Sequence, residues 1–414
     1  MPAVKSRIEE LAIVGGRPAF STELHVGRPN IGNRQTLLGR INDVLDRRWL
    51  TNDGPFLGDF EKRLCDRIGV KHCIAVCNAT IGLEILTKAI ALSGEVILPS
   101  FTFIATAHAL QWLGITPVFC DVDSATHNLD PSRVEELITG RTTGIIGVHL
   151  WGRPCNVDAL VDLTHRHKLK LLFDAAHAFG SSYKGRMIGS FGNAEIFSFH
   201  ATKFINSFEG GAIVTNDDEL AAKLRLARNF GFAGLDTVVC LGTNGKMSEV
   251  SAAMGLTSLE SFEEFVAANY RNYKEYQQRL ADIPGISVLR YNKEDEKCNY
   301  QYLVLEINEE AMGISRDQLV SMLWAENILT RRYFYPGCHQ MEPYRTDDPQ
   351  AALRLLQTEK LAKSVICLPT GSAVNSGQVT VICELIEFIV KHAKEVKERL
   401  SMKPIFRHRW QSSS

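Results

Sequence analysis

The sequence of 414 residues lacks an excess of charge of either sign, because 46 lysine and arginine residues are balanced by 47 aspartate and glutamate residues. Without a broad cationic surface, binding to a nucleic-acid backbone or an anionic membrane is disfavoured. No run approaches the roughly 18 apolar residues that span a bilayer, and residues 1–20 lack the basic and apolar segments of a secretory signal. These absences predict a cytoplasmic protein whose partners include neither nucleic acid nor a membrane.

The sequence also lacks several motifs that would indicate other chemistry. No CxxC pair occurs among its ten cysteines, several of which lie in apolar runs, as is typical of buried free thiols in a reducing compartment. A GxxxxGK[ST] phosphate loop and a GxGxxG after a strand are both missing, which disfavours nucleotide hydrolysis and NAD chemistry. The two histidines of THRHK (164–168) diverge on a helix, so we predict no metal site there.

Short apolar runs alternate with helix-length segments between residues 72 and 216. Because these runs are apolar on both faces, they are typical of strands buried between helix layers. The alternation predicts an α/β fold with a mainly parallel sheet covered by helices. The expected strands are 73–77, 95–99, 117–120, 144–150, 169–173, 194–199 and 211–215.

The pattern changes after about residue 255, where a charged helical stretch (258–283) begins. We predict a large domain over 1–256, a smaller α+β domain over 257–402 and a flexible tail over 403–414. Expected strands of the smaller domain lie around 285–291, 300–307 and 366–370, and expected helices lie near 315–327, 349–364 and 376–400.

One lysine, Lys203, lies in the aromatic and otherwise neutral stretch FSFHATKF (197–204). Burying a charged ammonium costs several kcal/mol unless it is paired or loses its proton. A desolvated, neutral lysine can form a Schiff base with an aldehyde. If that aldehyde is pyridoxal phosphate, a carboxylate must hold the ring nitrogen protonated, and Asp174, directly after an apolar run, fits this task. Alone, each residue is more often a surface lysine or a helix cap, but the pair favours the functional interpretation.

A phosphate site is predicted where NATIGLEILTKAIAL (78–92) begins a helix. The first amides of this helix, at Ala79 and Thr80, offer unpaired N–H groups and the helix dipole. Ser198 offers a hydroxyl on the run that leads to Lys203. Because ligands of such sheets bind at the carboxyl ends of the strands, we expect these groups to gather at one edge.

Four segments together resemble a known family. DAAHAFGSSYKGRMIGSFGNAEIFSFHATKFINSFEGGAIVTND (174–217), CNAT (77–80), PSFTFIATAHA (99–109) and GTNGKMSEVSAAMG (242–255) resemble the pyridoxal-phosphate-dependent nucleotide-sugar aminotransferases of the DegT/DnrJ/StrS type. The resemblance covers nearly the whole chain, and the central motif is highly specific. It implies the aspartate-aminotransferase fold, with a seven-stranded sheet in the large domain.

The resemblance also implies roles for individual residues. Lys203 would carry the Schiff base and move the proton, with pyridoxal phosphate and its amine form as cofactor. Asn244 matches an asparagine that reaches the phosphate of the neighbouring subunit, which implies a homodimer with shared active sites. The remaining cofactor positions are Asp174 at the ring nitrogen, Ala79, Thr80 and Ser198 at the phosphate, Phe103 on the ring face and His177 near the ring.

The loop RRYFYPGCHQMEPYR (331–345) matches the family's segment that approaches the sugar nucleotide. Arg331, Tyr335 and His339 are therefore candidate substrate contacts, and an ordinary loop anchored by aromatic residues is the alternative. Some relatives have histidine in place of the Schiff-base lysine and are dehydratases, so Lys203 argues for amino transfer.

The expected reaction moves an amino group from an amino acid, L-glutamate by the resemblance, to the keto carbon of a nucleotide-linked deoxysugar. The expected acceptor is C4 of dTDP-4-keto-6-deoxyglucose. Three alternatives stay open: a C3 aminotransferase acting on a related nucleotide sugar, a pyridoxal-phosphate-dependent sugar dehydratase, and a non-catalytic regulator that binds the cofactor or a sugar nucleotide.

Overall fold

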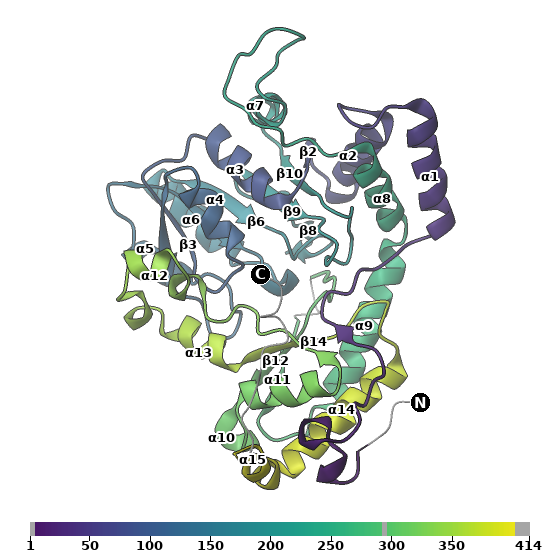
Figure 1. The fold of residues 1–414 in the computed structure, drawn as a ribbon. Helices are drawn as coiled ribbons and strands as arrows, with labels where there is room; N and C mark the ends of the chain where they lie inside the picture. Colours follow the sequence, from purple (N-terminus) through teal and green to yellow (C-terminus); the bar gives the residue numbers. More distant parts are fainter. Residues whose placement is uncertain (1–4, 292–295, 402–414) are drawn as a thin grey trace.

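The computed structural model describes residues 5–291 and 296–401, with side chains as far as residue 399. The chain builds a large seven-stranded sheet flanked by helices and, below it in Figure 1, a smaller region around a three-stranded sheet. The predicted tail over 403–414 lies outside the described residues.

The large sheet has the strand order β2-β10-β9-β6-β5-β3-β4. β10 runs antiparallel to both of its neighbours, so the other six strands share one direction. All seven expected strands are present, and the predicted α/β fold with a mainly parallel sheet is confirmed. Their bounds are β2 (His72–Val76), β3 (Glu95–Pro99), β4 (Thr116–Cys120), β5 (Thr142–Val148), β6 (Lys170–Asp174), β9 (Ala194–Ser198) and β10 (Gly211–Thr215).

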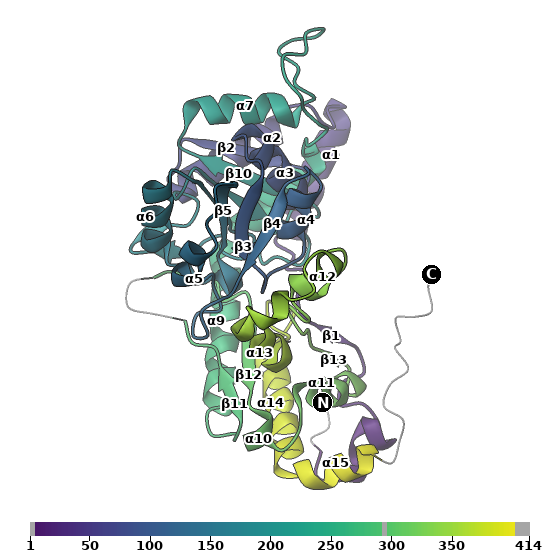
Figure 2. The ribbon, with the colours of Figure 1, turned by 90° about the vertical axis from the view of Figure 1, so that its left-hand side faces the viewer.

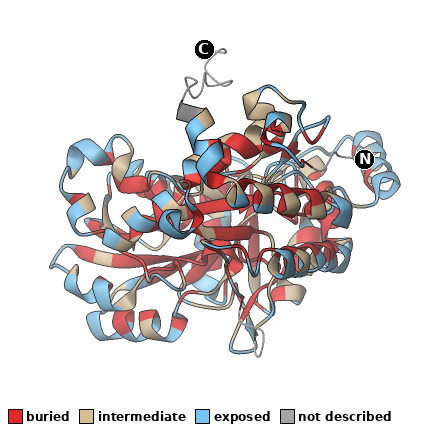
Figure 3. Ribbon diagram, turned by 90° about the horizontal axis from the view of Figure 1, so that it is seen from below, coloured by how far each residue is buried: buried red, intermediate tan, exposed pale blue. Residues whose placement is uncertain are grey.

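Helices cover both faces of this sheet, as Figure 2 shows for α5 and α6 on one side and α4 on the other. Successive strand residues alternate between the two cores, and the strands are buried along most of their length (Figure 3). One face packs on α3 (Ala79–Ala89), α4 (Ala105–Gln111) and α7 (Asp218–Arg228). The other packs on α2 (Pro55–Ile68), α5 (Pro131–Glu136), α6 (Val157–His167) and α8 (Glu249–Glu260), and α1 (Arg34–Arg47) contacts α8.

The helix expected after residue 78 is α3. The Asn78 side chain accepts a hydrogen bond of 2.9 Å from the Ile81 N–H group, which starts the helix as a standard N-cap. Gly82 lets the helix approach the sheet closely, because a Cβ atom there would lie 2.5 Å from the Ile196 side chain. The N-terminus of α3 is therefore held at the carboxyl end of β2.

The smaller region contains an antiparallel sheet of β11 (Ile286–Val288), β12 (Leu303–Ile307) and β14 (Val365–Leu368). Its helices include α9 (Phe262–Arg279), α11 (Arg316–Ala325), α13 (Leu356–Ser364), α14 (Ser376–Lys391) and α15 (Ala393–Ser401). The expected helix over 349–364 is thus shorter at its start, and the one expected over 258–283 begins after a break at Ser261.

The N-terminal segment packs on this smaller region. β1 (Leu24–His25) pairs with β13 (Ile328–Leu329), and Ile8, Leu11 and Phe20 join the same apolar core. The predicted domain boundary at residues 256 and 257 stays a prediction. Within residues 5–291 and 296–401, no helix is long and apolar enough to cross a membrane, and no group of histidine, cysteine and acidic residues could hold a metal ion.

Candidate active site

A cavity of about 550 Å³ lies at the carboxyl ends of β6 and β9. Side chains from the large sheet and from the smaller region line it together, as expected for this edge of a parallel sheet. It brings together eight of the predicted site residues: Ala79, Thr80, Phe103, Asp174, His177, Ser198, Lys203 and Arg331.

Lys203 lies in the loop that follows β9, where its backbone N–H group donates 2.8 Å to the His200 carbonyl. Desolvation of the ammonium in the cavity lowers the pKa of Lys203 to about 8, although the negative charge of Asp174 opposes this shift. A neutral amine is therefore accessible near physiological pH, as a Schiff-base lysine requires.

The lowered pKa of Lys203 predicts how the apoprotein captures an aldehyde. Below pH 8 the amine is protonated and unreactive, so the rate of capture should rise with pH and reach half its maximum at about 8, against about 10.5 for an ordinary lysine. The initial rate of absorbance change on mixing with pyridoxal, which carries no titrating phosphate, measures this. A midpoint above 10 would show that the cavity does not desolvate the amine.

Asp174 is the last residue of β6 and is only 7% exposed. One carboxylate oxygen accepts a 2.7 Å hydrogen bond from the Thr106 hydroxyl, and the other accepts 3.1 Å from the Ala176 N–H group. Because an ionised carboxylate offers about four acceptor positions, it can take a further donor. The residue thus fits a protonated ring nitrogen in the cavity.

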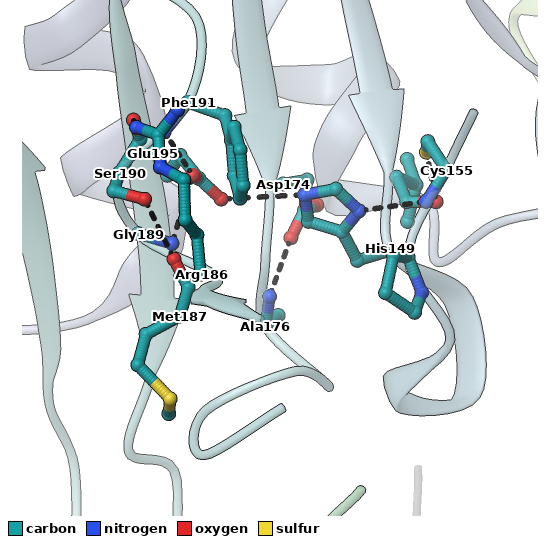
Figure 4. A network of polar contacts seen from close by, with 12 residues as sticks. His149, Cys155, Asp174, Ala176, Arg186, Met187, Gly189, Ser190, Phe191 and Glu195 are labelled. Atoms are coloured by element: carbon teal, nitrogen blue, oxygen red, sulfur yellow. Dashed lines mark hydrogen bonds and ion pairs between the residues drawn. The ribbon is translucent and has the colours of Figure 1, made fainter. Parts of the chain in front are cut away.

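A buried polar network holds the strand end that carries Asp174 (Figure 4). The His149 N–H group donates 3.0 Å to the Asp174 carbonyl, and His149 Nδ1 accepts 2.9 Å from the Cys155 N–H group. His149 Nε2 lies 3.3 Å from Glu195 Oε2, and neither side chain is exposed. Since these residues belong to or follow β5, β6 and β9, the network ties three adjacent strands together behind the cavity.

Glu195→Ala is expected to lower the free energy of unfolding by about 3–5 kcal/mol, as is usual when one partner of a buried pair is removed. The change leaves His149 Nε2 without its carboxylate and removes the acceptor of the Gly189 and Phe191 N–H groups. Urea unfolding measures the difference. As a control, Glu136→Ala removes an exposed carboxylate of α5 and should change stability by less than about 0.5 kcal/mol. Equal losses in both variants would contradict a structural role for the network.

The N-terminus of α3 offers a cradle for the cofactor phosphate. Asn78 accepts from Ile81 and Gly82, whereas the N–H groups of Ala79 and Thr80 have no acceptor within the helix. Ser198 pairs with Gly211 on β10, and a Cβ atom on Gly211 would lie 2.8 Å from the Ala79 nitrogen. The glycine therefore keeps the cradle open, and these residues fit a phosphate group.

His177 and Phe103 approach the cavity from two loops. Nδ1 of His177 accepts 3.3 Å from the Trp151 N–H group, and its Nε2 lies 3.1 Å from the Tyr302 hydroxyl. Burial, aided by the charge of Lys203, lowers the pKa of His177 well below its usual value, so the ring is neutral. Phe103 follows β3 and is 57% exposed, which leaves its ring free to cover a bound group.

Three predicted residues do not line this cavity. Asn244 lies exposed at the end of the loop over 229–245, which projects above α7 in Figure 1. Tyr335 lines a neighbouring cavity of about 320 Å³ that shares Arg331 with the first. His339 is 2% exposed, and its two ring nitrogens lie 2.7 Å from the Ser100 hydroxyl and 3.0 Å from Glu359. Both ring nitrogens of His339 thus already have partners, and its role as a substrate contact stays a prediction.

The residues of the site that sequence reasoning missed include Thr106, Tyr302, Tyr333 and Phe334. Thr106 contacts Asp174 only because α4 packs on the face of the large sheet, where it contacts β3 and β4, and the other three reach the cavity from the smaller region. Tyr333 and Phe334 belong to the loop 331–345, which was predicted to contact the substrate. No motif in the sequence indicated a role for Tyr302.

A desolvated lysine facing a carboxylate, with a helix N-terminus beside them on this sheet, defines the class of pyridoxal-phosphate-dependent aminotransferases. The chain belongs to the DegT/DnrJ/EryC1/StrS aminotransferase family, whose model matches residues 33–387. It is therefore an enzyme of the sugar-aminotransferase type, and the predicted family and cofactor are confirmed.

Individual relatives cover almost the whole chain. A dTDP-4-amino-4,6-dideoxy-D-glucose transaminase of Shigella dysenteriae is 35% identical over 381 residues, which make up 92% of this chain and 100% of that protein. A GDP-perosamine synthase of Caulobacter vibrioides is 36% identical over 84% of this chain and 94% of that protein. The structure of DesI in the presence of its TDP-sugar product superposes with a TM-score of 0.91 at 47% identity, covering 95% of this chain and 100% of that one.

Proposed function

We propose that this enzyme transfers the amino group of L-glutamate to C4 of dTDP-4-keto-6-deoxyglucose. The observation that carries the proposal is the placement of Lys203 against Asp174 in a cavity of a chain from a sugar-aminotransferase family. The sugar and the nucleotide are supported by similarity to the Shigella transaminase and to DesI, which was solved with a TDP-sugar.

When bound, pyridoxal phosphate supplies an aldehyde and an electron sink that no side chain can provide. Lys203 would bond that aldehyde and hold or release the proton that moves during transfer, a role that its pKa of about 8 suits. Asp174 would accept the ring N–H group, while Ala79, Thr80 and Ser198 would donate to the phosphate. Phe103 and His177 would exclude water from the ring.

The sugar nucleotide would approach along the cavities that meet at Arg331. This guanidinium lines the main cavity and two adjoining ones, each of about 320 Å³. Arg332 and Tyr335 lie in one of them, with the Arg332 guanidinium 4.7 Å from the Tyr335 ring. Because guanidinium groups bind phosphate oxygens well, we assign the diphosphate to Arg331 and Arg332 and a stacking contact to Tyr335.

A homodimer with shared sites is part of the proposal. Asn244 is exposed, and large apolar side chains are exposed on its loop, with Leu235 94% exposed. Further exposed apolar residues lie in the segment that contains α1: Ile31, Leu38, Leu45, Trp49 and Leu50. Such exposure favours an interface. The free cysteines suit the reducing cytoplasm as the enzyme's location.

The test is to incubate the purified enzyme and L-glutamate with dTDP-4-keto-6-deoxyglucose and to follow 2-oxoglutarate and the sugar product together. Formation of a 4-amino sugar in step with 2-oxoglutarate is the expected result. Parallel reactions with the corresponding 3-keto sugar and with GDP-4-keto-6-deoxymannose test the ring carbon and the nucleotide. Faster amination of either alternative, or loss of water without 2-oxoglutarate, would overturn the assignment.

A further inference from the structure

The two chain neighbours of Lys203 both contact the N-terminal segment. Gly27 has φ of 73°, a left-handed conformation that favours glycine, and a Cβ atom there would lie 3.0 Å from the Thr202 Cβ atom. Further along the same segment, the Asn30 side-chain amide donates 3.1 Å to the Phe204 carbonyl. The N-terminal segment therefore contacts the chain on both sides of the lysine.

Lys203 lies in the lysine loop (residues 199–210), which joins β9 to β10. The first turn of this loop is closed by the 2.8 Å hydrogen bond from the Lys203 N–H group to the His200 carbonyl. Residues 204–206, which follow, belong to neither a helix nor a strand. The orientation of the peptide groups directly after the lysine therefore depends on contacts from outside the loop.

Asn30 is 3% exposed, and its hydrogen bonds fix the direction of its side chain. Oδ1 accepts 3.0 Å from the Ser372 N–H group and 2.6 Å from the Ser372 hydroxyl. Because an oxygen with two donors cannot be exchanged for an N–H₂ group, the amide nitrogen must face the Phe204 carbonyl. The Asn30 backbone carbonyl accepts a further 2.9 Å hydrogen bond from the Asn206 side chain. One buried residue thus joins the lysine loop to the smaller region by two bonds on one side and two on the other.

Both ends of this link are held by packed helices. Ser372 lies in the loop after β14, where the buried Asn272 of α9 donates 3.1 Å to the Gly371 carbonyl. On the other side, the Ser258 hydroxyl of α8 donates 2.8 Å to the Asn206 carbonyl. The link therefore has fixed anchors, and it can set the position of the backbone next to the lysine.

We propose that Asn30 is a positioning residue for amino transfer, which orients the lysine loop so that the Lys203 amine stays in the cavity beside Asp174. The inference rests on the proposed function, in which this amine reacts. Asn30 does not line the cavity, so it would act only through the loop. A displacement of about 1 Å at a reacting group can slow a reaction by about 10²-fold, so the contact should affect rate rather than substrate binding.

The test measures the initial rate at which the apoprotein captures pyridoxal, as a function of pH, for the unsubstituted protein, Asn30→Ala and Asn33→Ala. Asn30→Ala is expected to lower the maximal rate of capture about tenfold, and kcat by a similar factor with KM for the sugar unchanged. Its midpoint should stay at about 8, because the side chains that desolvate Lys203 are unaltered. Asn33 is the matched control, since alanine there also removes a hydrogen bond from this segment, the 3.0 Å bond from the Thr36 N–H group.

Slower capture with an unchanged midpoint in Asn30→Ala, but not in Asn33→Ala, supports the proposal. A lower unfolding temperature alone, with capture and kcat as in the unsubstituted enzyme, would show that the contact is merely structural and would overturn it. Equal slowing in both variants, or a shifted midpoint in Asn30→Ala, would overturn it too, because the change would then not act on the position of the amine.

A second variant keeps the test decisive if Asn30→Ala does not fold. Asn206→Ala removes the other bond between Asn30 and the lysine loop and should slow capture in the same way, whereas an unchanged rate would contradict the proposal. The unsubstituted protein separates this inference from the proposed function. If its apoprotein captured pyridoxal on a lysine other than Lys203, the proposed function itself would fail, whatever the variants showed.

Discussion

Lys203→Ala is expected to abolish amino transfer, with a loss of at least about 10⁴-fold in kcat. Under the proposed function the side chain has two roles that alanine cannot replace, because it would bond the cofactor aldehyde and would carry the proton. Proton transfer alone is worth about 10²–10⁴-fold. Borohydride reduction followed by peptide mass spectrometry checks the first role directly. The unsubstituted enzyme should gain a pyridoxyl group on Lys203, and the variant should gain none.

Two further variants separate the chemistry from general damage. Lys203→Arg keeps a cation in the cavity but cannot lose its proton, so it should be as inactive as Lys203→Ala. Lys223→Ala removes an exposed lysine of α7 and should leave both activity and labelling unchanged. Full amination by Lys203→Ala, or labelling of a different lysine in the unsubstituted enzyme, would show that the reacting amine lies elsewhere.

The fold was predictable from the sequence because the large sheet is covered on both sides. A strand buried on two faces must be apolar throughout, as in Ile74–Val76 and Ile145–Ile146, and this pattern needs no knowledge of its neighbours. The antiparallel direction of β10 was not predictable in the same way. An apolar run such as GAIVT (211–215) predicts a buried strand but does not indicate whether that strand runs parallel or antiparallel to its neighbours. β10 follows β9 through the loop of residues 199–210, which contains Lys203, and the local sequence does not reveal the path of this loop.

The site was predictable where a residue's role depends on its place along the strand that carries it. Asp174, Ser198 and Lys203 end or follow strands of one sheet, so the topology alone brings them together. The role of His339 depends instead on tertiary packing. It belongs to the loop expected to bind the substrate, but contacts with Ser100 and Glu359 bury its side chain. Tyr302 depends on how the smaller region docks on the large sheet, a tertiary contact that leaves no motif in the chain.

Asp174→Asn is expected to lower kcat/KM by about 10²–10³-fold, the usual cost of losing one preorganised electrostatic contact in a dry site. Asparagine keeps the shape and the acceptor for Ala176 but removes the negative charge that would hold the ring nitrogen protonated. Thr106→Val is the matched variant, because it keeps that charge and removes only the 2.7 Å hydrogen bond that orients it. It should cost about tenfold, in line with the loss of one hydrogen bond to a charged group.

Asp174→Asn should also lower the pKa of Lys203. The Asp174 carboxylate favours the charged ammonium, and desolvation opposes it, which together give a pKa of about 8. Removing the carboxylate leaves desolvation unopposed, so the midpoint for aldehyde capture by the apoprotein should fall below 8 in Asp174→Asn and stay near 8 in Thr106→Val. A midpoint that rises, or kcat/KM within about tenfold of the unsubstituted enzyme, would contradict the pairing of this acid with this amine.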